Sequence, residues 1–454
     1  MTRREALGVM AAAPLAGAEA RPNIVFIMAD DLGYGDLSCY GRTDYKTPNV
    51  DRLAAQGMRF TQAYANSAVC SATRAALMTG RYQYRLPVGL EEPIADRDRN
   101  VGIPTEHPTL PSLLRGAGYA TTLVGKWHLG WLPEYSPLKS GYEHFWGFRS
   151  GGIDYYTHKS GAANTDSEDL WEGDTKIQRE GYLTDLLGDR AVAVIEAART
   201  PFLLSLHFNA PHWPWEAPGD EAESKRVHRL ASFDAGSMTT FARMVERMDF
   251  QVGRVLAALD KTGAAKNTIV VFTSDNGGER FSNTWPFSGM KSELLEGGLR
   301  VPAIVGWPGR VARGTTSQQV SITMDWVPTL LAAAAVSGDA AYPSDGLSLL
   351  PVLRGQAPVV QRKLFWRFRS KAQAAVRDGD LKWLRLGGNT FLFDLIADPR
   401  ERANLKDRRP EDYRRLMAEY AAWEAGMLPL DQKTATYEFT PAQLADHYAP
   451  AAKP

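Results

Sequence analysis

The chain has 454 residues, 44% of them hydrophobic and 23% charged, and its 52 basic and 52 acidic side chains give a formal net charge of zero. This length and composition are typical of a globular protein with one large domain and a smaller one. The balanced charge argues against a nucleic-acid or polybasic membrane partner, and two cysteines exclude a disulfide scaffold.

The first 20 residues resemble an export signal. A twin arginine at positions 3 and 4 precedes a short apolar run, residues 7–17, and residues 18–20 (AEA) resemble a signal-peptidase site. The run is too short to span a bilayer, and no later segment predicts a membrane span. We expect export to a periplasmic or extracellular space; the alternative is a frayed terminus without a signal.

The first predicted strand ends in two carboxylates. Residues 23–29, NIVFIMA, are apolar throughout except for Asn23, as expected of a strand buried on both faces, and Asp30 and Asp31 follow directly. Ligands of open α/β sheets gather beyond the carboxyl ends of the strands. Either aspartate alone could be a turn or capping residue, but the adjacent pair needs a neutralising cation or protons, which favours a metal site.

Residues 67–82, SAVCSATRAALMTGRY, place Cys70 just before an expected helix that opens with residues 72–78. Arg74 would share a helix face with position 70. Helix N-termini suit anionic groups, and a cysteine there beside an arginine should ionise easily. Taken alone, the segment favours a small, buried, inert cysteine; the other segments reverse that preference.

Two further strands lead to candidate cationic groups. Residues 120–124 lead to GKWHLG, in which Lys126 and His128 are two apart and can point to the same side. Residues 201–208 lead to His212. An exposed lysine and hydrogen-bonded histidines would be the ordinary explanation for each of these residues taken singly.

A fourth strand repeats the design of the first. Residues 268–273, TIVVFT, are followed by Asp275 and Asn276. Together with the first strand this gives three carboxylates and one amide oxygen, a set that suits a hard cation, with Ca²⁺ favoured over Mg²⁺ because few waters need remain. The expected metal ligands are Asp30, Asp31, Asp275 and Asn276.

Strands and helices alternate over at least 300 residues, which predicts an α/β fold: a large mixed, mostly parallel sheet sandwiched by helices. The expected helices are residues 47–57, 110–118, 182–199, 239–259 and 320–334. The clearest is 239–259, whose apolar stripe we assign to the core. Residues 131–180 are expected to be loop-rich, and such loops often carry specificity.

The tail predicts a small C-terminal α+β subdomain with an antiparallel sheet. A linker, residues 351–362, precedes four short strands with a hairpin signal at 377–380 and a helix over 410–427. We divide the chain into a signal peptide (1–20), a large catalytic domain (21–355) and this subdomain (356–454). We find no candidate chemistry in the subdomain, and expect Trp366 and Trp383 in its core.

Together these segments resemble the type I sulfatases of the alkaline-phosphatase-like superfamily. The matching pieces are NIVFIMADDLGYGD, CSATRAALMTGRY, GKWHLG, FNAPHWP, FTSDNGG and GMKSELLEGGLRVP. They occur in the family's order and cover roughly residues 21–310. Each piece alone is moderately specific, but six in sequence are very hard to obtain otherwise.

The resemblance implies a formylglycine at position 70, made from Cys70 by a maturation enzyme, whose hydrated gem-diol is the nucleophile. It implies one Ca²⁺ per chain, bound by the four oxygen-bearing residues and the modified residue 70. It also implies that Arg74 holds the formylglycine and that the sulfate is surrounded by Lys126, His128, His212 and Lys291. In this scheme a protonated His212 or Lys291 assists the leaving alcohol, and His128 takes a proton as sulfate is eliminated.

Physical chemistry supports these roles, because a metal and several cations stabilise charge that spreads over the sulfate oxygens, and acid–base help contributes about 10² to 10⁴ in rate. One position departs from the family's usual Cys-x-Pro-x-Arg motif, since Ala72 replaces the proline. An alanine variant is known within the family. The departure leaves open which maturation enzyme acts and how completely Cys70 is converted.

The leading interpretation is an exo-acting carbohydrate sulfatase that also cleaves aryl sulfates. Residues 151–158, GGIDYYTH, and 86–94 look most similar to the branch that acts on N-acetylgalactosamine sulfates. The expected substrate-binding residues are Ser150, Asp154, Trp213, Trp215 and Arg300. The alternatives are a phosphate or phosphonate monoester hydrolase, which a second metal site would favour, and an inactive glycan-binding protein with unmodified Cys70. The oligomeric state stays open.

Overall fold

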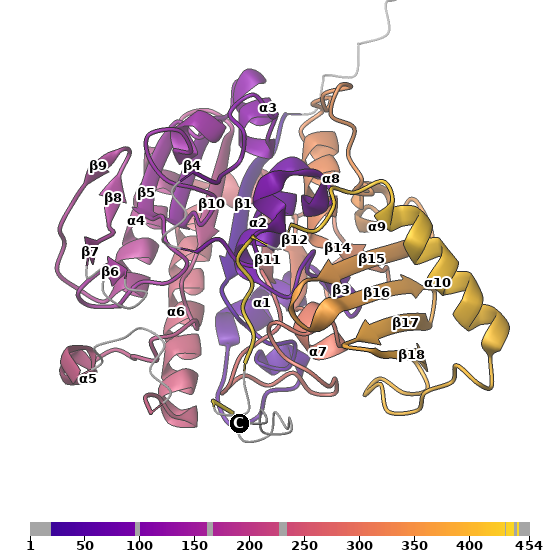
Figure 1. The fold of residues 1–454 in the computed structure, drawn as a ribbon. Helices are drawn as coiled ribbons and strands as arrows, with labels where there is room; N and C mark the ends of the chain where they lie inside the picture. Colours follow the sequence, from indigo (N-terminus) through magenta and orange to yellow (C-terminus); the bar gives the residue numbers. More distant parts are fainter. Residues whose placement is uncertain are drawn as a thin grey trace, which may run out of the picture.

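The computed structural model describes residues 20–95, 100–160, 167–226, 234–431, 433–439 and 443–444 (Figure 1). The expected signal peptide lies outside the described residues, except for Ala20, and stays a prediction. None of the described helices combines the length and apolar character that a membrane span requires.

A ten-stranded sheet forms the centre of the large domain, in the order β13-β2-β12-β11-β1-β10-β4-β5-β8-β9. Its strands are β1 (Asn23–Ala29), β2 (Met58–Phe60), β4 (Ala120–Lys126), β5 (His144–Phe148), β8 (Trp171–Glu172), β9 (Thr175–Lys176), β10 (Phe202–His207), β11 (Thr268–Ser274), β12 (Ala303–Gly306) and β13 (Thr315–Ser317). The five central strands, from β11 to β5, run parallel, whereas β12 and β8 are antiparallel to their neighbours. The carboxyl ends of the central strands therefore meet at one edge.

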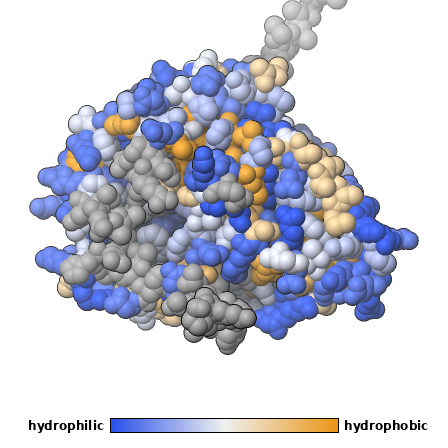
Figure 2. Space-filling view, in the orientation of Figure 1, coloured by the Kyte–Doolittle hydropathy of each residue, from blue (hydrophilic) through white to orange (hydrophobic). Residues whose placement is uncertain are grey.

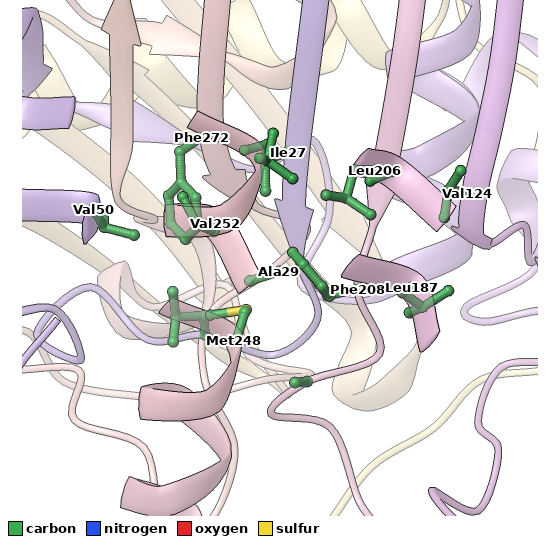
Figure 3. Packing of buried hydrophobic residues seen from close by; sticks show 14 of the residues in the cluster. Ile27, Ala29, Val50, Val124, Leu187, Leu206, Phe208, Met248, Val252 and Phe272 are labelled. Carbon is green, nitrogen blue, oxygen red and sulfur yellow. The ribbon is translucent and has the colours of Figure 1, made fainter. Parts of the chain in front are cut away.

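Helices cover both faces of this sheet because successive side chains of a strand point to opposite faces. On one face, Val25 and Ile27 of β1 pack with α1 (Pro48–Gln56), α4 (Leu183–Ala197) and α6 (Met238–Thr262). Figure 3 shows Met248 and Val252 of α6 among strand side chains of this cluster. On the other face, Ile24 of β1 packs in a second cluster with α2 (Cys70–Thr79), α3 (Leu110–Gly116) and α8 (Trp326–Ala333).

The C-terminal region forms a second, separate sheet, visible with its helix on the right of Figure 1. Its strands β15 (Lys363–Phe368), β16 (Gln373–Asp378), β17 (Leu381–Leu386) and β18 (Asn389–Asp394) pair antiparallel in chain order, and α10 (Pro410–Glu424) packs on them. Trp366 and Trp383 are buried, as expected. The predicted fold class, a large mixed sheet between helices with a small antiparallel sheet after it, is confirmed.

Several predicted boundaries differ from the structure. The strand expected over 120–124 continues to Lys126, because β4 pairs with β10 and β5 along its length. The loop-rich region 131–180 contains β5, which extends the main sheet, as well as β8 and β9 and the small pair β6 (Lys159–Ser160) and β7 (Ser167–Glu168). Short strands of this kind carry too few residues for an alternation pattern to be recognised in the sequence.

The helix expected over residues 320–334 is shorter than predicted. Its first residues form β14 (Ser321–Ile322), which pairs with β3 (Ala63–Tyr64), and a 3-10 turn (Thr323–Asp325) precedes α8. The expected linker 351–362 begins within the short helix α9 (Leu350–Leu353), and another short helix, α5 (Glu221–Arg226), was not predicted. The helix α7 (Glu296–Leu299) follows the Lys291 loop. The face in Figure 2 is mostly hydrophilic, with small apolar patches.

Candidate active site

The carboxyl ends of the central strands bring the predicted polar residues together. Asp30 and Asp31 follow β1, and Asp275 and Asn276 follow its neighbour β11, so both pairs lie at the same sheet edge. The backbone N–H of Asp31 donates to Oδ1 of Asp275 at 3.3 Å. The side-chain amide of Asn276 donates to Oδ1 of Asp31 at 2.6 Å. All four side chains are buried.

Cys70 is the first residue of α2, and this helix start faces the same cluster. Its Sγ lies within 4.8 Å of carboxylate oxygens of Asp30 and Asp275. Arg74, one turn later, donates to Oδ2 of Asp275 from Nε at 3.1 Å and from Nη2 at 2.8 Å. A guanidinium and a buried thiol therefore share the helix face predicted from their spacing.

The donor set fits a hard cation. Oδ1 of Asp30 and Oδ1 of Asn276 are buried, and neither has a hydrogen-bond partner within the described part of the chain. Burial and the neighbouring Asp275 hold the pKa of Asp30 well above its ordinary value, against the opposing effect of Lys126 and Arg74. A divalent cation coordinated by these oxygens would satisfy the orphaned acceptors and offset the repulsion between the carboxylates.

Two lysines reach the cluster from different segments. Lys126, at the end of β4, places Nζ 2.6 Å from Oδ2 of Asp30. Lys291 places Nζ 2.7 Å from Oδ2 of Asp31. Although burial opposes its charge, Asp31 and Cys70 hold the pKa of Lys291 well above its ordinary value. Both ammonium groups are thus held beside the carboxylates, where an anionic substrate group would also bind.

Two histidines lie at this group, His212 by direct contact with Asp31 and His128 through the adjacent Gly151–Gly152 loop. Nε2 of His212 lies 3.6 Å from Oδ2 of Asp31, and its Nδ1 is 2.6 Å from the carbonyl oxygen of Trp213. Burial, with Lys291 and Lys126 nearby, holds the pKa of His212 well below its ordinary value. Nε2 of His128 lies 3.0 Å from the carbonyl oxygen of Ile94.

Two glycines pack directly on these rings. A Cβ at Gly151 would lie 2.7 Å from Cε1 of His128, and a Cβ at Gly152 would lie 3.2 Å from Cε1 of His212. Side chains at these positions would displace the imidazoles. The loop that carries the two glycines therefore forms a wall of the site.

Three residues of these segments have a strained backbone. Asp31, His128 and Ser292, which follows Lys291, have φ values of 63°, 52° and 70°. Residues other than glycine rarely adopt this left-handed region, and such strain persists where the surrounding structure imposes it. The backbone is thus held in unfavourable conformations at three of the pocket's segments.

The expected substrate-binding residues fall into different environments. Trp213 is half-buried, and its ring centroid lies 4.2 Å from that of His212. Trp215 is buried and packs edge-on against Phe281. The described contacts of Arg300 are with a separate polar cluster, since it donates to the hydroxyl of Tyr64 and pairs with Glu296 at 2.9 Å.

Ser150 and Asp154 are occupied by contacts with their own loop region and, for Asp154, with Ser224 of α5. The backbone N–H of Ser150 donates to Asp169, and its hydroxyl donates to the carbonyl oxygen of Gly152 at 2.8 Å. Asp154 accepts hydrogen bonds from Thr157 and other neighbours. The hydroxyl of Ser150 thus helps to hold the loop whose glycines pack on His128 and His212.

Two residues of the site were not predicted. His207, the last residue of β10, places Nδ1 3.3 Å from Nη1 of Arg74, and burial with this guanidinium lowers its pKa to about 3. Glu279 is buried, with Oε2 at 3.8 Å from Nζ of Lys291. Glu279 follows Asn276 by three residues, so the polar stretch after β11 is the feature of the sequence that could have indicated it.

A mostly parallel sheet between two helical layers, with an acidic cluster, a helix-start cysteine and buried cations at its carboxyl edge, is the arrangement of the alkaline-phosphatase-like enzymes, which hydrolyse anionic esters. The sulfatase family model matches residues 22–336, and a model for the C-terminal part of N-sulphoglucosamine sulphohydrolase matches residues 290–421. The chain belongs to the sulfatase family, and it is a sulfuric ester hydrolase.

Individual relatives agree with this assignment. The chain is 34% identical over 401 residues to N-acetylgalactosamine-6-sulfatase of Rattus norvegicus, covering 83% of this chain and 73% of that protein. It is 32% identical over 461 residues to steryl-sulfatase of Mus musculus, covering 82% and 71%. Among solved structures, Ps i-CgsB superposes with a TM-score of 0.82 and 29% identity, covering 95% of this chain and 98% of that one.

Proposed function

We propose that this enzyme releases inorganic sulfate from a sulfated carbohydrate, and that it uses a formylglycine made from Cys70 together with one bound Ca²⁺. The observation that carries the proposal is the distance between Cys70 and the acidic cluster: its Sγ lies within 4.8 Å of carboxylate oxygens of Asp30 and Asp275. A modified side chain at this position and a cation would share one anion pocket.

The cation would be held by oxygens of Asp30, Asp31, Asp275 and Asn276 and by the modified residue 70. When bound, it would polarise a sulfate oxygen and neutralise charge that develops in the transition state. The hydrated formylglycine would supply the nucleophilic oxygen. Both clusters of possible ligands in the described chain contain Asp30, which supports one cation site rather than the two that would favour a phosphatase.

The remaining side chains bind charge and move protons. Lys126 and Lys291 place ammonium groups at the acidic cluster, where they would bind the sulfate oxygens and stabilise the charge that spreads over them. Lys291 would donate the proton that the leaving alcohol needs, because its raised pKa keeps the ammonium group charged. His212, whose pKa is lowered, could take this role only if a bound anion raised its pKa. His128 would accept a proton when sulfate is eliminated, and Arg74 would hold residue 70 in place through its bonds to Asp275.

The proposed substrate class is a sulfated glycan, with an N-acetylgalactosamine or galactose sulfate as the first candidate. The rat relative is named for N-acetylgalactosamine-6-sulfate, and Ps i-CgsB has a structure in complex with k-i-k-neocarrahexaose. Trp213 is half-buried beside His212. Its indole is the proposed stacking surface for the apolar face of a sugar ring, because an aromatic side chain offers a large, flat apolar surface. Aryl sulfates would be accepted as small substrates.

The proposal also includes the domain division of the chain and its export. The chain would consist of an export signal over residues 1–20, a catalytic domain over 21–355 and a C-terminal subdomain over 356–454, and would act outside the cytoplasm. N-terminal sequencing of the mature protein from its native host tests the signal: a start near Arg21 supports export, and an intact N-terminus contradicts it.

The function is tested by producing the protein together with a formylglycine-generating enzyme and measuring sulfate release from sulfated mono- and disaccharides and from 4-nitrophenyl sulfate. We expect turnover that calcium restores after chelation and that Cys70→Ala abolishes. Faster turnover of 4-nitrophenyl phosphate than of every sulfate ester would instead support the phosphatase alternative. No activity, with Cys70 unmodified in protein from the native host, would support the glycan-binding alternative.

A further inference from the structure

We propose that Glu279 is a substrate-binding residue, whose carboxylate accepts a hydrogen bond from a hydroxyl or amide N–H group of the sugar near the sulfated carbon. The proposal rests on the sulfatase function proposed above and adds a specificity determinant to it. Neither the sequence motifs nor the expected roles of the other pocket residues assign any function to this position.

Glu279 is a buried carboxylate to which no described donor makes a hydrogen bond of good geometry. Its side chain is 3% exposed, and neither Oε1 nor Oε2 accepts a hydrogen bond from any described residue. A buried carboxylate left in this state loses the hydration that stabilises its charge, so such groups are almost always paired or hydrogen-bonded. Burial accordingly raises the pKa of Glu279 to about 7, although Lys291 and, more weakly, the side-chain N–H of Trp213 oppose the shift.

The carboxylate lies next to Lys291, one of the proposed sulfate-binding groups. Its Oε2 is 3.8 Å from Nζ of Lys291, and the same Nζ is 2.7 Å from Asp31. The ammonium group of Lys291 is also 5.9 Å from the ring centroid of Trp213, the proposed sugar platform. A ligand that places its sulfate against Lys291 would therefore bring its neighbouring ring substituents toward Glu279.

Neighbouring protein groups satisfy the carboxylate only in part, since the side-chain N–H of Trp213 lowers its pKa but makes no hydrogen bond of good geometry. Lys291 is already held by Asp31 at hydrogen-bond distance, so a second carboxylate at 3.8 Å adds little to its position. The guanidinium of Arg280 is 4.0 Å from Oε1, and its Cζ lies 4.1 Å over the ring of Trp215. The carboxylate therefore keeps acceptor capacity that a donor on the substrate could use.

A carboxylate acceptor in this place would select among sulfate esters. A site built to hydrogen-bond a substrate hydroxyl or N–H group rejects analogues that lack it, because the buried acceptor then stays unpaired. Sugars offer such a donor on the carbon next to the sulfate, whereas 4-nitrophenyl sulfate offers none. Glu279 would thus raise kcat/KM for sugar sulfates over aryl sulfates.

The test compares Glu279→Ala and Glu279→Gln with the wild type on the best sugar sulfate of the panel, on its monodeoxy analogues and on 4-nitrophenyl sulfate. We expect Glu279→Ala to lower kcat/KM for the sugar sulfate by about 10- to 100-fold, as for a hydrogen bond to a charged group. The effect on 4-nitrophenyl sulfate should stay within about threefold, and one deoxy analogue should abolish the difference between variant and wild type.

An equal loss on the sugar and the aryl sulfate would overturn the inference. A loss on the sugar sulfate that no monodeoxy analogue abolishes would also overturn it, because Glu279 would then act through Lys291 and not through a bond to the sugar. If the proposed sulfatase function itself is wrong, the result is different: the wild-type protein releases sulfate from none of the sugars. Thermal unfolding separates binding from a structural role. Glu279→Gln should unfold at the same or a higher temperature, whereas Asp325→Asn, which alters a buried carboxylate bonded to Arg362 and Leu347, should unfold at a lower one.

Discussion

Arg74 and Asp275 are joined by two hydrogen bonds to one carboxylate oxygen, at 3.1 and 2.8 Å, although 201 residues separate them in the chain. Arg74 belongs to the first turns of α2, and Asp275 directly follows β11. The pair therefore fixes the start of the helix that carries Cys70 against the strand end that carries metal ligands. Both side chains are buried, so the connection is shielded from solvent.

Replacing Arg74 should break the connection between the start of α2 and the end of β11. Removal of one partner of a buried ion pair costs about 3 to 5 kcal/mol of unfolding free energy, because the other charge stays buried and unpaired. We expect Arg74→Ala to lose about that much stability in urea unfolding, together with nearly all sulfate release. Arg243→Ala, which removes a partly exposed pair with Asp220, is the matched control and should cost less than about 1 kcal/mol. Equal costs for the two variants would contradict the assignment.

Lys291→Met should slow the reaction most for substrates with poor leaving groups. If Lys291 donates a proton to the leaving oxygen, its loss lowers kcat for a sugar sulfate by about 10² to 10⁴. 4-Nitrophenolate leaves without protonation, so the loss on 4-nitrophenyl sulfate should be clearly smaller. Lys261→Met, at an exposed lysine on α6, serves as the control and should leave both rates unchanged. Losses of the same size on the two esters would assign Lys291 to sulfate binding alone.

The C-terminal sheet should contribute to catalysis through Gln373. Its Nε2 donates to the carbonyl oxygen of Ser292 at 2.9 Å, and its Oε1 accepts from the N–H of Leu294 at 2.8 Å. These bonds hold the strained segment next to Lys291, so Gln373→Ala should lower kcat roughly 10- to 100-fold with a smaller change in KM. Gln373→Glu keeps the acceptor for Leu294 and should recover part of kcat. Unchanged kinetics in the alanine variant would show that the segment holds its own conformation.

Stability should fall with rising pH because of Glu92. Burial raises the pKa of this carboxyl to about 8, against the effects of a backbone bond from Arg369 and of Arg367. Between its unfolded value of 4.5 and about 8, the folded state keeps a proton that the unfolded state releases. This group therefore lowers the unfolding free energy by about 1.4 kcal/mol per pH unit in that window.

Glu92→Gln removes the titrating proton, so the stability difference between variant and wild type should grow in the variant's favour from pH 5 to pH 8. Urea unfolding at several pH values measures it. A difference that stays constant over this range would mean that Glu92 titrates near its ordinary value in the folded protein.

The sequence predicted the parts of the fold that local patterns determine. β1 has the predicted bounds, because a long apolar run bounded by polar residues has few other interpretations, and α6 matches its apolar stripe within three residues. β5 was missed because its position depends on pairing with β4, which no local pattern encodes. Likewise, Ser321–Ile322 became a strand instead of a helix start because Ala63–Tyr64 offers a partner.

For the site, strand ends gave a physical reason to group Asp30 with Asp275, and the structure places them together. His207 and Glu279 could not be predicted in the same way. Each is a polar residue within or near an apolar strand, and its role depends on Arg74 or Lys291 approaching from a distant segment. Arg300 shows the reverse case, since it lies within a family motif but its described contacts include Tyr64 and Glu296, away from the acidic cluster.

The central claim is that a converted Cys70 and a bound calcium ion act in one pocket, and the dose dependence of activity on conversion tests it directly. Preparations with different fractions of formylglycine, quantified by mass spectrometry of the peptide that contains residue 70, are assayed for sulfate release at saturating calcium. The account predicts a rate proportional to the converted fraction, zero for unconverted protein and for Cys70→Ala, and lost on chelation. Sulfate release by fully unconverted protein, or none by fully converted protein on every sulfate ester of the panel, would contradict it.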